Sequence, residues 1–174
     1  PTYIQKALKR FQHPPPMKPQ NQPHPSVKQT YGAKVQYANN GDDSPLLDKN
    51  GKRFIQQVNG KFLFLGRAVD LTILTALSAI AAQQASPTEE TKKRAIQLLD
   101  YLASQEEAIL TYRASDMVLA VHSDASYLSE TKARSRTGGH FFMSDNSEAP
   151  PNNGAILTIA QIIKAVMSSA AEAE

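Results

Sequence analysis

The chain has 174 residues, of which 41% are hydrophobic, and its formal net charge is +3 at pH 7. That length suits one domain or two small ones, and the hydrophobic content is enough for a globular core. There is no cysteine, which excludes a disulfide framework, a thiolate nucleophile and a zinc–thiolate site, and which suits an intracellular protein of the cytoplasm or nucleus. No apolar run approaches the ~20 residues of a membrane helix, so we expect no membrane partner. The N-terminus does not resemble a signal peptide.

Basic residues and prolines are concentrated near the N-terminus. Residues 1–41 carry six Lys or Arg and no acid, whereas the remainder carries 13 basic and 16 acidic residues. Seven of the 11 prolines lie in the first 25 residues. The spacing of Ile4, Leu8 and Phe11 predicts a short helix over 3–12, which the prolines at 14–16 end. We interpret residues 1–52 as a basic, proline-rich arm or linker, which indicates either a polyanionic partner or a solubilising role.

Helical periodicity dominates residues 53–108. A first helix begins near Arg53, and Gly60 in it is available for close packing. A second helix is predicted over 69–83. The third begins at Ser86, which we expect to be its N-cap, with Pro87 in the first helical position and two acids in the first turn. The inward-facing residues are predicted to be Phe54, Val58, Phe62 and Leu65 in the first helix, Ile73, Leu74, Leu77 and Ile80 in the second, and Ala95, Leu98, Leu99 and Leu102 in the third.

The pattern changes to that of strands in residues 109–174. Strands are predicted at 110–112, 117–122, 138–143 and 155–163, and the second of these is apolar enough for a buried central position. A polar turn over 145–154 joins the last two strands. Ser168 or Ser169 then caps a new helix. A strand meander followed by a helix is the beginning of an α+β domain, so the predicted fold class of the chain is α+β.

Two carboxylates are the candidate catalytic and metal-binding residues. Asp124 follows the strand over 117–122, and a carboxylate that leaves the end of a buried strand is held rigidly, as metal ligation requires; the same position also suits a turn or cap. Glu172 lies in the first turn of the last helix. Because residues 169–172 read Ser-Ala-Ala-Glu, Glu172 suits a capping box as well as a catalytic role.

Further polar side chains have two interpretations each. His122 faces the same side of its strand as Asp124 and could join a site, although a packed strand histidine is the plainer interpretation, and the same holds for His140. Lys132, Arg134 and Arg136 can either contact phosphates or belong to a solvated loop.

Taken in chain order, these segments resemble the C-terminal part of a copia-type retrotransposon polyprotein. Residues 54–65 are similar to the segment in which these elements place Ile-Gly followed by Leu-Leu-Tyr-Leu. Residues 67–70 (Arg-Ala-Val-Asp) match the position of their Arg-Pro-Asp, and residues 95–102 continue into the helix that usually ends Arg-Tyr-Leu. Residues 122–126 (His-Ser-Asp-Ala-Ser) resemble Tyr-Ser-Asp-Ala-Asp, which opens the family's ribonuclease H domain. Residues 135–142 are similar to its Ser-Thr-Ser-Gly-Tyr-Val-Phe-Phe, and residues 169–174 (Ser-Ala-Ala-Glu-Ala-Glu) correspond to Ser-Ser-Thr-Glu-Ala-Glu.

The resemblance implies that residues 53–108 form a thumb/connection-like unit at the end of a reverse transcriptase. It also implies that residues 109–174 are the N-terminal part of a truncated ribonuclease H-like domain. The parent protein would hydrolyse the RNA strand of RNA–DNA hybrids by two-metal catalysis, with Asp124 and Glu172 binding Mg²⁺ or Mn²⁺ in the complete domain. Ser126 stands where the family has a second Asp, and the family's further acids lie beyond Glu174, so we expect this fragment of a longer protein to be inactive alone.

The expected partners are an RNA–DNA hybrid or another nucleic acid and the remainder of the polyprotein. One alternative is a non-catalytic nucleic-acid-binding relic of such an element, in which the basic arm and the helices carry the function. A second alternative is an unrelated helical interaction module.

Overall fold

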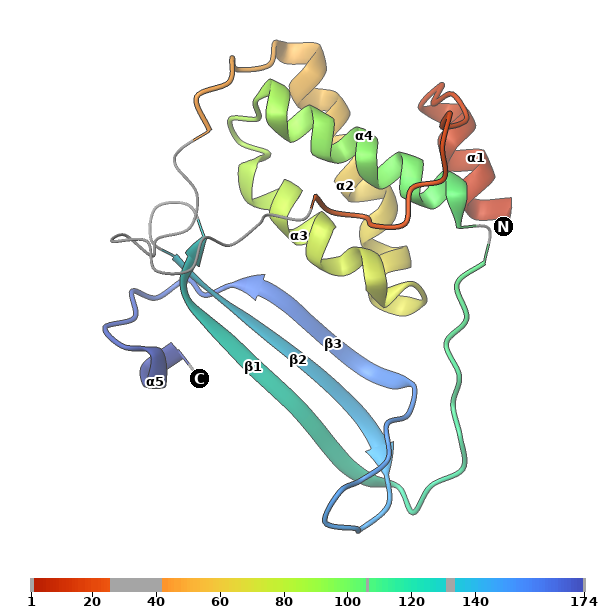
Figure 1. The fold of residues 1–174 in the computed structure, drawn as a ribbon, viewed down its shortest axis with the longest axis vertical. Helices are drawn as coiled ribbons and strands as arrows, with labels where there is room; N and C mark the ends of the chain where they lie inside the picture. Colours follow the sequence, from red (N-terminus) through yellow and green to blue (C-terminus); the bar gives the residue numbers. More distant parts are fainter. Residues whose placement is uncertain (1, 26–41, 106, 131–133, 174) are drawn as a thin grey trace. The chain divides into compact units, whose positions relative to one another are not determined.

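The computed structural model describes residues 2–25, 42–105, 107–130 and 134–173, which divide into two compact units. Unit 1 is helical and contains the described residues up to 108, and unit 2 contains a sheet and the described residues from 109 onward. The described residues include five α-helices and a three-stranded antiparallel sheet (Figure 1). The mixed α+β fold class predicted from the sequence is therefore confirmed.

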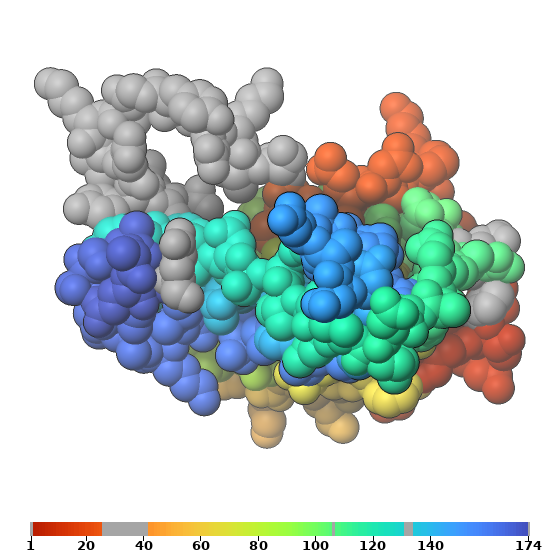
Figure 2. Space-filling model, turned by 90° about the horizontal axis from the view of Figure 1, so that it is seen from below, coloured from red at the N-terminus to blue at the C-terminus, as the bar shows by residue number. Residues whose placement is uncertain are grey.

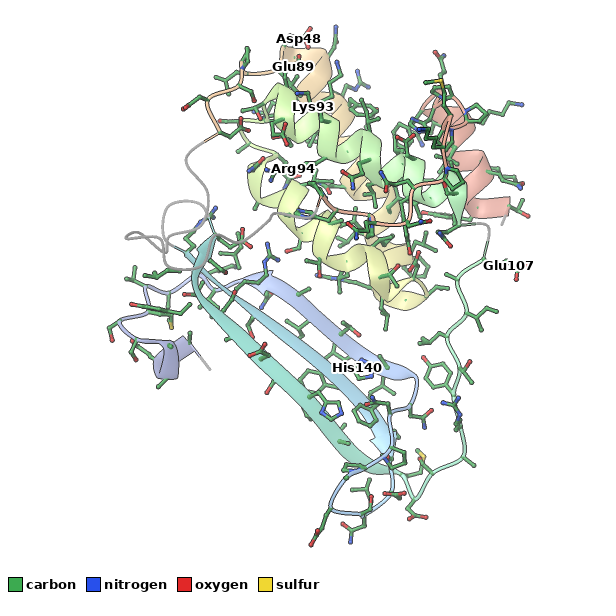
Figure 3. The ribbon with its side chains drawn as sticks, viewed as in Figure 1. Asp48, Glu89, Lys93, Arg94, Glu107 and His140 are labelled. Atoms are coloured by element: carbon green, nitrogen blue, oxygen red, sulfur yellow. The ribbon has the colours of Figure 1, made fainter. Side chains whose placement is uncertain are left out.

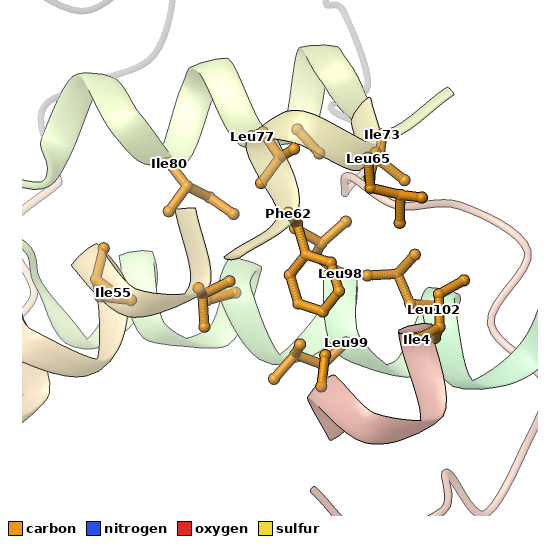
Figure 4. Packing of buried hydrophobic residues seen from close by; sticks show 14 residues of the cluster. Ile4, Ile55, Phe62, Leu65, Ile73, Leu77, Ile80, Leu98, Leu99 and Leu102 are labelled. Atoms are coloured by element: carbon orange, nitrogen blue, oxygen red, sulfur yellow. The ribbon is translucent and has the colours of Figure 1, made fainter. Parts of the chain in front are cut away.

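Unit 1 consists of four α-helices and one short 3₁₀ helix around an apolar core. They are α1 (Thr2–Arg10), α2 (Lys49–Ala68), η1 (Leu71–Ile73), α3 (Leu74–Gln83) and α4 (Glu89–Ser104). Phe62 is fully buried and lies at the centre of the apolar cluster (Figure 4). The inward-facing residues predicted for the three central helices all lie in this core or pack against it. Helix α1, which the sequence assigns to the N-terminal arm, contributes Ile4 and Ala7 to the same core.

Local capping decides where α2 and α4 begin. Helix α2 begins at Lys49, earlier than the expected Arg53, because the Asp48 side chain accepts a hydrogen bond from the Gly51 amide at 2.7 Å. The N-cap of α4 is Thr88 and not Ser86, and a capping box joins Thr88 to Thr91. The reason is tertiary, since Thr88 pairs with Leu46 in an isolated antiparallel bridge and has extended backbone angles, so the helix begins only after it.

The glycine that allows close helix packing is Gly66, not Gly60. A Cβ added to Gly66 would lie 3.0 Å from Leu77 Cδ1 and 3.2 Å from Ile73 Cγ1, so this glycine lets α2 approach η1 and α3. A Cβ added to Gly60 would meet nothing within 4 Å. Gly60 is exposed, and the packing role expected for it is wrong.

The proline-rich segment after α1 lies along α4. The His13 ring contacts the Asp100 carboxylate at 2.7 Å, and the Gln20 amide donates to Ser104 Oγ at 2.9 Å. Further along, Gln97 Nε2 donates to the Gln22 carbonyl at 3.1 Å. Residues 13–22 are therefore attached to unit 1 by side-chain hydrogen bonds, whereas residues 26–41 of the expected arm lie outside the described residues.

Unit 2 is built on the sheet β1 (Val118–Glu130), β2 (Arg134–Ser144) and β3 (Ala155–Ile162), in the order β1-β2-β3. Both pairings are antiparallel, and His122 lies opposite His140 while Asp124 lies opposite Gly138. The turn predicted over 145–154 joins β2 to β3 as expected. Strand β1 does not end at His122 but continues to Glu130, so Asp124 lies in the middle of a strand. The strand is also mostly exposed, and its expected buried position is wrong.

Residues 110–112 form no strand, and the extended segment is attached to unit 2 by a side chain at the next residue, Arg113. Asn153 Oδ1 accepts from the Arg113 amide at 2.7 Å, and Asn153 Nδ2 donates to the Arg113 carbonyl at 2.9 Å and to the Met143 carbonyl at 2.8 Å. A Cβ on Gly154 would lie 2.7 Å from the Thr111 carbonyl oxygen, so only glycine fits there. Asn153 and Gly154 together hold this extended segment against unit 2.

No helix in the described part of the chain combines the length and the apolar character needed to cross a membrane. Helix α2 has 20 residues, but five of them are Lys or Arg.

Candidate functional site

Asp124 projects from the middle of β1 and is exposed. Its Oδ1 atom accepts a hydrogen bond from the amide of the next residue, Ala125, at 2.8 Å. The residue opposite it on β2 is Gly138, so no side chain stands across from the carboxylate on that strand. Asp124 is thus held by a regular strand and is not part of a turn or a helix cap.

Glu172 lies in the first turn of α5 (Ala170–Ala173) and is also exposed. The Glu172 amide donates to Ser169 Oγ at 3.2 Å, so Ser169 is the cap, as one of the two expected serines. The carboxylate reaches back beyond the cap to Ser168, whose amide and hydroxyl donate to Oε2 at 2.6 and 2.5 Å. These hydrogen bonds, that of the Ser168 side chain first, lower the pKa of Glu172 from its ordinary value. In Figure 2 the C-terminal segment is dark blue and lies at the surface.

Helix α5 packs against β1 and β2, so the element that carries Glu172 lies beside the strand that carries Asp124 (Figure 1). Carboxylate oxygens are the ligands that Mg²⁺ and Mn²⁺ prefer. Within the described ranges, however, no three His, Asp or Glu side chains gather closely enough to hold a metal ion. The ligand type fits a divalent metal but the number of ligands does not, so these two residues do not form a complete metal site. Glu174, the last acid, lies outside the described residues.

The two strand histidines pack against one aromatic ring. The rings of His122 and His140 each lie 5.1 Å from the buried Phe142 ring, centroid to centroid. His122 Nε2 contacts Asn152 Oδ1 at 3.0 Å, and His140 Nε2 contacts the Asn153 carbonyl at 3.3 Å (His140 is labelled in Figure 3). Both imidazoles therefore hold the β2–β3 turn over the sheet, which agrees with the interpretation of packed histidines.

Arg134 and Arg136 lie on β2 and not in a solvated loop. Arg136 Nε contacts Glu130 Oε1 at 2.6 Å, and only 14% of the Arg136 side chain is exposed. This ion pair closes the end of the β1–β2 hairpin, so Arg136 has a structural partner in place of a phosphate. Lys132 lies outside the described residues.

A pocket of about 280 Å³ lies in unit 2 between the extended segment 113–116 and the β2–β3 turn. Neither Asp124 nor Glu172 lines it. Asn153 and its hydrogen-bond partner Arg113 both line it, so the pocket lies where the extended segment meets the turn and is separate from the candidate carboxylates.

The sequence analysis did not single out a basic helical surface, which is a further candidate for a functional feature. Helix α1 carries three Lys or Arg and α2 carries five, and neither helix contains an acid. Along α2, one exposed stripe recurs at spacings of three and four residues, namely Arg53, Gln57, Gly60, Phe64 and Arg67. Phe64 is 73% exposed, which is unusual for a large aromatic side chain. The sequence could have revealed this stripe, because the helical periodicity that defines the inward face of α2 also defines its outward face.

Comparison with known proteins identifies no relative: no protein-family model, curated protein or solved structure matches this chain.

Proposed function

We propose that the chain is part of a copia-type retrotransposon polyprotein, with unit 1 as its thumb/connection-like part and unit 2 as the beginning of its ribonuclease H-like domain. The parent protein would hydrolyse the RNA strand of RNA–DNA hybrids. The observation that supports this best is the packing of α5, with Glu172 in its first turn, against β1, with Asp124 in its middle. A hairpin meander followed by a helix that brings a second carboxylate to the first strand is the arrangement that the resemblance implies.

The experiment is a graft into an active ribonuclease H domain of the copia type. Residues 109–173 replace the corresponding strands and helix start, and Mg²⁺-dependent cleavage of the RNA strand of a hybrid is measured. We expect the graft to cleave and the Asp124→Asn and Glu172→Gln grafts not to cleave, whereas Asp116→Asn, which removes another acid of the same unit, retains activity. A folded graft that binds hybrid without cutting it would count against this function.

A second candidate, non-catalytic nucleic-acid binding, is favoured by the acid-free surface of α1 and α2. Lys and Arg side chains neutralise phosphates and release counterions, so such binding weakens steeply as salt rises. An exposed aromatic ring among basic residues adds a surface on which a base can stack. The stripe from Arg53 to Arg67, with Phe64 inside it, has both properties.

Salt-dependent binding to a labelled hybrid tests this candidate on the full chain. The double variant Arg53→Ala/Arg67→Ala should bind more weakly, and the slope of log K against log salt should fall by about 0.9 for each phosphate that the variant no longer neutralises. Lys93→Ala is the matched control, because it removes an exposed cation from α4 in the same unit. Equal decreases in affinity in the control and the double variant would show that α2 has no special part. Binding that is indifferent to Asp124→Asn, combined with an inactive graft, would favour this candidate over the first.

A further inference from the structure

Helix α1 runs antiparallel to α2, and an aromatic ring of α1 contacts a cation of α2. The Tyr3 hydroxyl donates to the Lys61 carbonyl, and Lys61 Nζ lies 4.3 Å from the centroid of the Tyr3 ring. Just after the end of α1, the Phe11 ring lies 5.8 Å from the Phe54 ring, centroid to centroid, in an edge-to-face arrangement. The start of α1 therefore lies beside the late part of α2, and the end of α1 lies beside the early part of α2.

The exposed surfaces of both helices are basic. On α1, Tyr3, Lys6 and Arg10 are exposed and recur at spacings of three and four residues, so they share one stripe. Because Tyr3 contacts α2, this stripe borders that helix, which carries the exposed stripe from Arg53 to Arg67. Neither helix contains an acid, and the cations of the two stripes form no ion pair with an acid in the described part of the chain. Their charge is therefore available to a polyanion.

Two aromatic rings are exposed among these cations. Phe64 follows Lys61 by three residues, so the two side chains are neighbours on the surface of α2, and Lys61 in turn lies over Tyr3. The exposed fraction is 73% for Phe64 and 39% for Tyr3. An aromatic ring that is exposed between cations offers a face on which a nucleic-acid base can stack.

This combination of rings and cations discriminates between kinds of nucleic acid. The cations suit the phosphates of any nucleic acid, whether single-stranded or double-stranded. In a duplex or a hybrid each base is stacked between its neighbours, whereas the bases of a single strand can turn out and stack on protein rings. From Arg53 to Phe64 the stripe is about 16 Å long at the rise of an α-helix, which is the length of about five stacked nucleotides of one strand.

We infer that the basic surface of α1 and α2 binds single-stranded nucleic acid, with bases stacked on Tyr3 and Phe64 and phosphates on the cations of the two stripes. Lys61 positions the Tyr3 ring against α2 through its cation–π contact. The inference rests on the nucleic-acid-binding candidate described above, and it deepens that candidate by naming the kind of nucleic acid.

The first test compares the affinities of the full chain for labelled oligouridine, oligodeoxythymidine and an RNA–DNA hybrid at constant salt. Each strand has about ten nucleotides, within the usual site sizes of single-strand-binding surfaces. Both single strands should bind more tightly than the hybrid, and the ratio of their affinities distinguishes RNA from DNA as the preferred ligand. Phe64→Leu and Tyr3→Leu should each weaken single-strand binding roughly fivefold to 150-fold, as for the loss of one stacked base, and leave hybrid binding unchanged. Tyr3→Phe keeps the ring and should bind as the parent chain does.

Tryptophan fluorescence supplies a readout of stacking itself. The chain contains no tryptophan, so Phe64→Trp and Leu63→Trp each introduce a single indole. Both positions are exposed on α2, but consecutive residues point about 100° apart around a helix, so Leu63 lies off the stripe and is the matched control. Oligouridine should quench the emission of the Phe64→Trp variant, because a base stacks on the indole, and should leave that of the Leu63→Trp variant unchanged.

The outcomes separate this inference from the candidate on which it rests. Equal quenching at the two positions, or quenching at neither, would overturn the inference. Ring variants that weaken single-strand and hybrid binding to the same extent would also overturn it, and salt-dependent binding of the hybrid would still support the nucleic-acid-binding candidate. If the parent chain binds neither the single strands nor the hybrid at low salt, both the candidate and the inference are wrong.

Discussion

Replacing Gly60 by alanine should stabilise the protein and weaken its binding to nucleic acid. Gly60 is an exposed residue in the interior of α2, and an added Cβ would meet nothing within 4 Å. Because glycine is about 0.8–1.0 kcal/mol less favourable than alanine inside a helix, Gly60→Ala should raise the free energy of unfolding of unit 1 by about 1 kcal/mol. The packing of unit 1 does not require a glycine at position 60. We therefore expect that a bound nucleic acid approaches the backbone there closely, and that an added Cβ weakens this contact.

Gly66→Ala in the same helix is the matched comparison. It gains the same helix propensity, but its Cβ would lie 3.0 Å from Leu77 Cδ1 and 3.2 Å from Ile73 Cγ1. Overpacking of this kind costs about 1–3 kcal/mol, so Gly60→Ala should be the more stable variant by about that amount. Urea unfolding followed by far-ultraviolet circular dichroism measures both stabilities, and fluorescence anisotropy with a labelled hybrid at constant salt measures binding.

Two results would refute this reasoning. A Gly60→Ala variant less stable than the parent chain would mean that the position is not open. A Gly60→Ala variant that is more stable and binds hybrid as tightly as the parent would mean that no partner approaches this face of α2. Phe64→Ala tests the contribution of the aromatic ring to binding separately from that of Gly60. Removing a stacking ring should weaken single-strand binding by about 1–3 kcal/mol, and Gly60 is unchanged in this variant.

Three further predictions concern stability and turnover. Asn153→Ala should destabilise unit 2 by at least about 2 kcal/mol, since it removes four side-chain hydrogen bonds that each contribute roughly 0.5–1.5 kcal/mol. Asn152→Ala, with one such bond to His122, should cost less than half as much in urea unfolding. Burial raises the pKa of Asp42. Hydrogen bonds from Ser44 and Thr88 and the charge of Arg94 lower that pKa by more than burial raises it, so the net shift is downward. Its stabilisation of unit 1 is therefore present above the unfolded pKa of ~3.9 and is lost as the pH falls through the lower folded pKa; acid titration of Asp42→Asn should lack that loss, which Asp43→Asn retains. Finally, the chain alone should not cleave hybrid with Mg²⁺ or Mn²⁺, because two carboxylates cannot hold two metal ions, and turnover that Asp124→Asn abolishes would contradict this expectation.

The helices of unit 1 were predictable because each obeys local rules. The apolar spacing that places Val58, Phe62 and Leu65 inward, and the acids at the start of α4, act within a few residues of each other along the chain. The boundaries were less predictable. The cap of α4 moved from Ser86 to Thr88 because a segment some 40 residues earlier pairs with it, and the local sequence pattern does not contain that pairing.

In the sheet, too, the residue types predicted the order of the elements, whereas their boundaries depended on distant parts of the chain. Residue types alone indicated strands, a polar turn and a helix start in the correct order, and they drew attention to Asp124 and Glu172. Only the tertiary structure decided that β1 continues past Asp124, since strand length depends on the partner strand and β2 extends far enough to pair with it. The same is true of residues 110–112, which form no strand and are followed directly by Arg113, the residue whose backbone bonds to the Asn153 side chain.

The sequence by itself determined the composition of each unit, the inward faces of the helices and the identity of the two candidate carboxylates. The tertiary structure decided which glycine is packed and which is exposed, which basic residues share one helical surface, and that Tyr127 reaches Ser168 across 41 residues of chain. The physical reason is that periodicity and capping are local, whereas packing clearances and hydrogen bonds between distant residues exist only once the elements have come together.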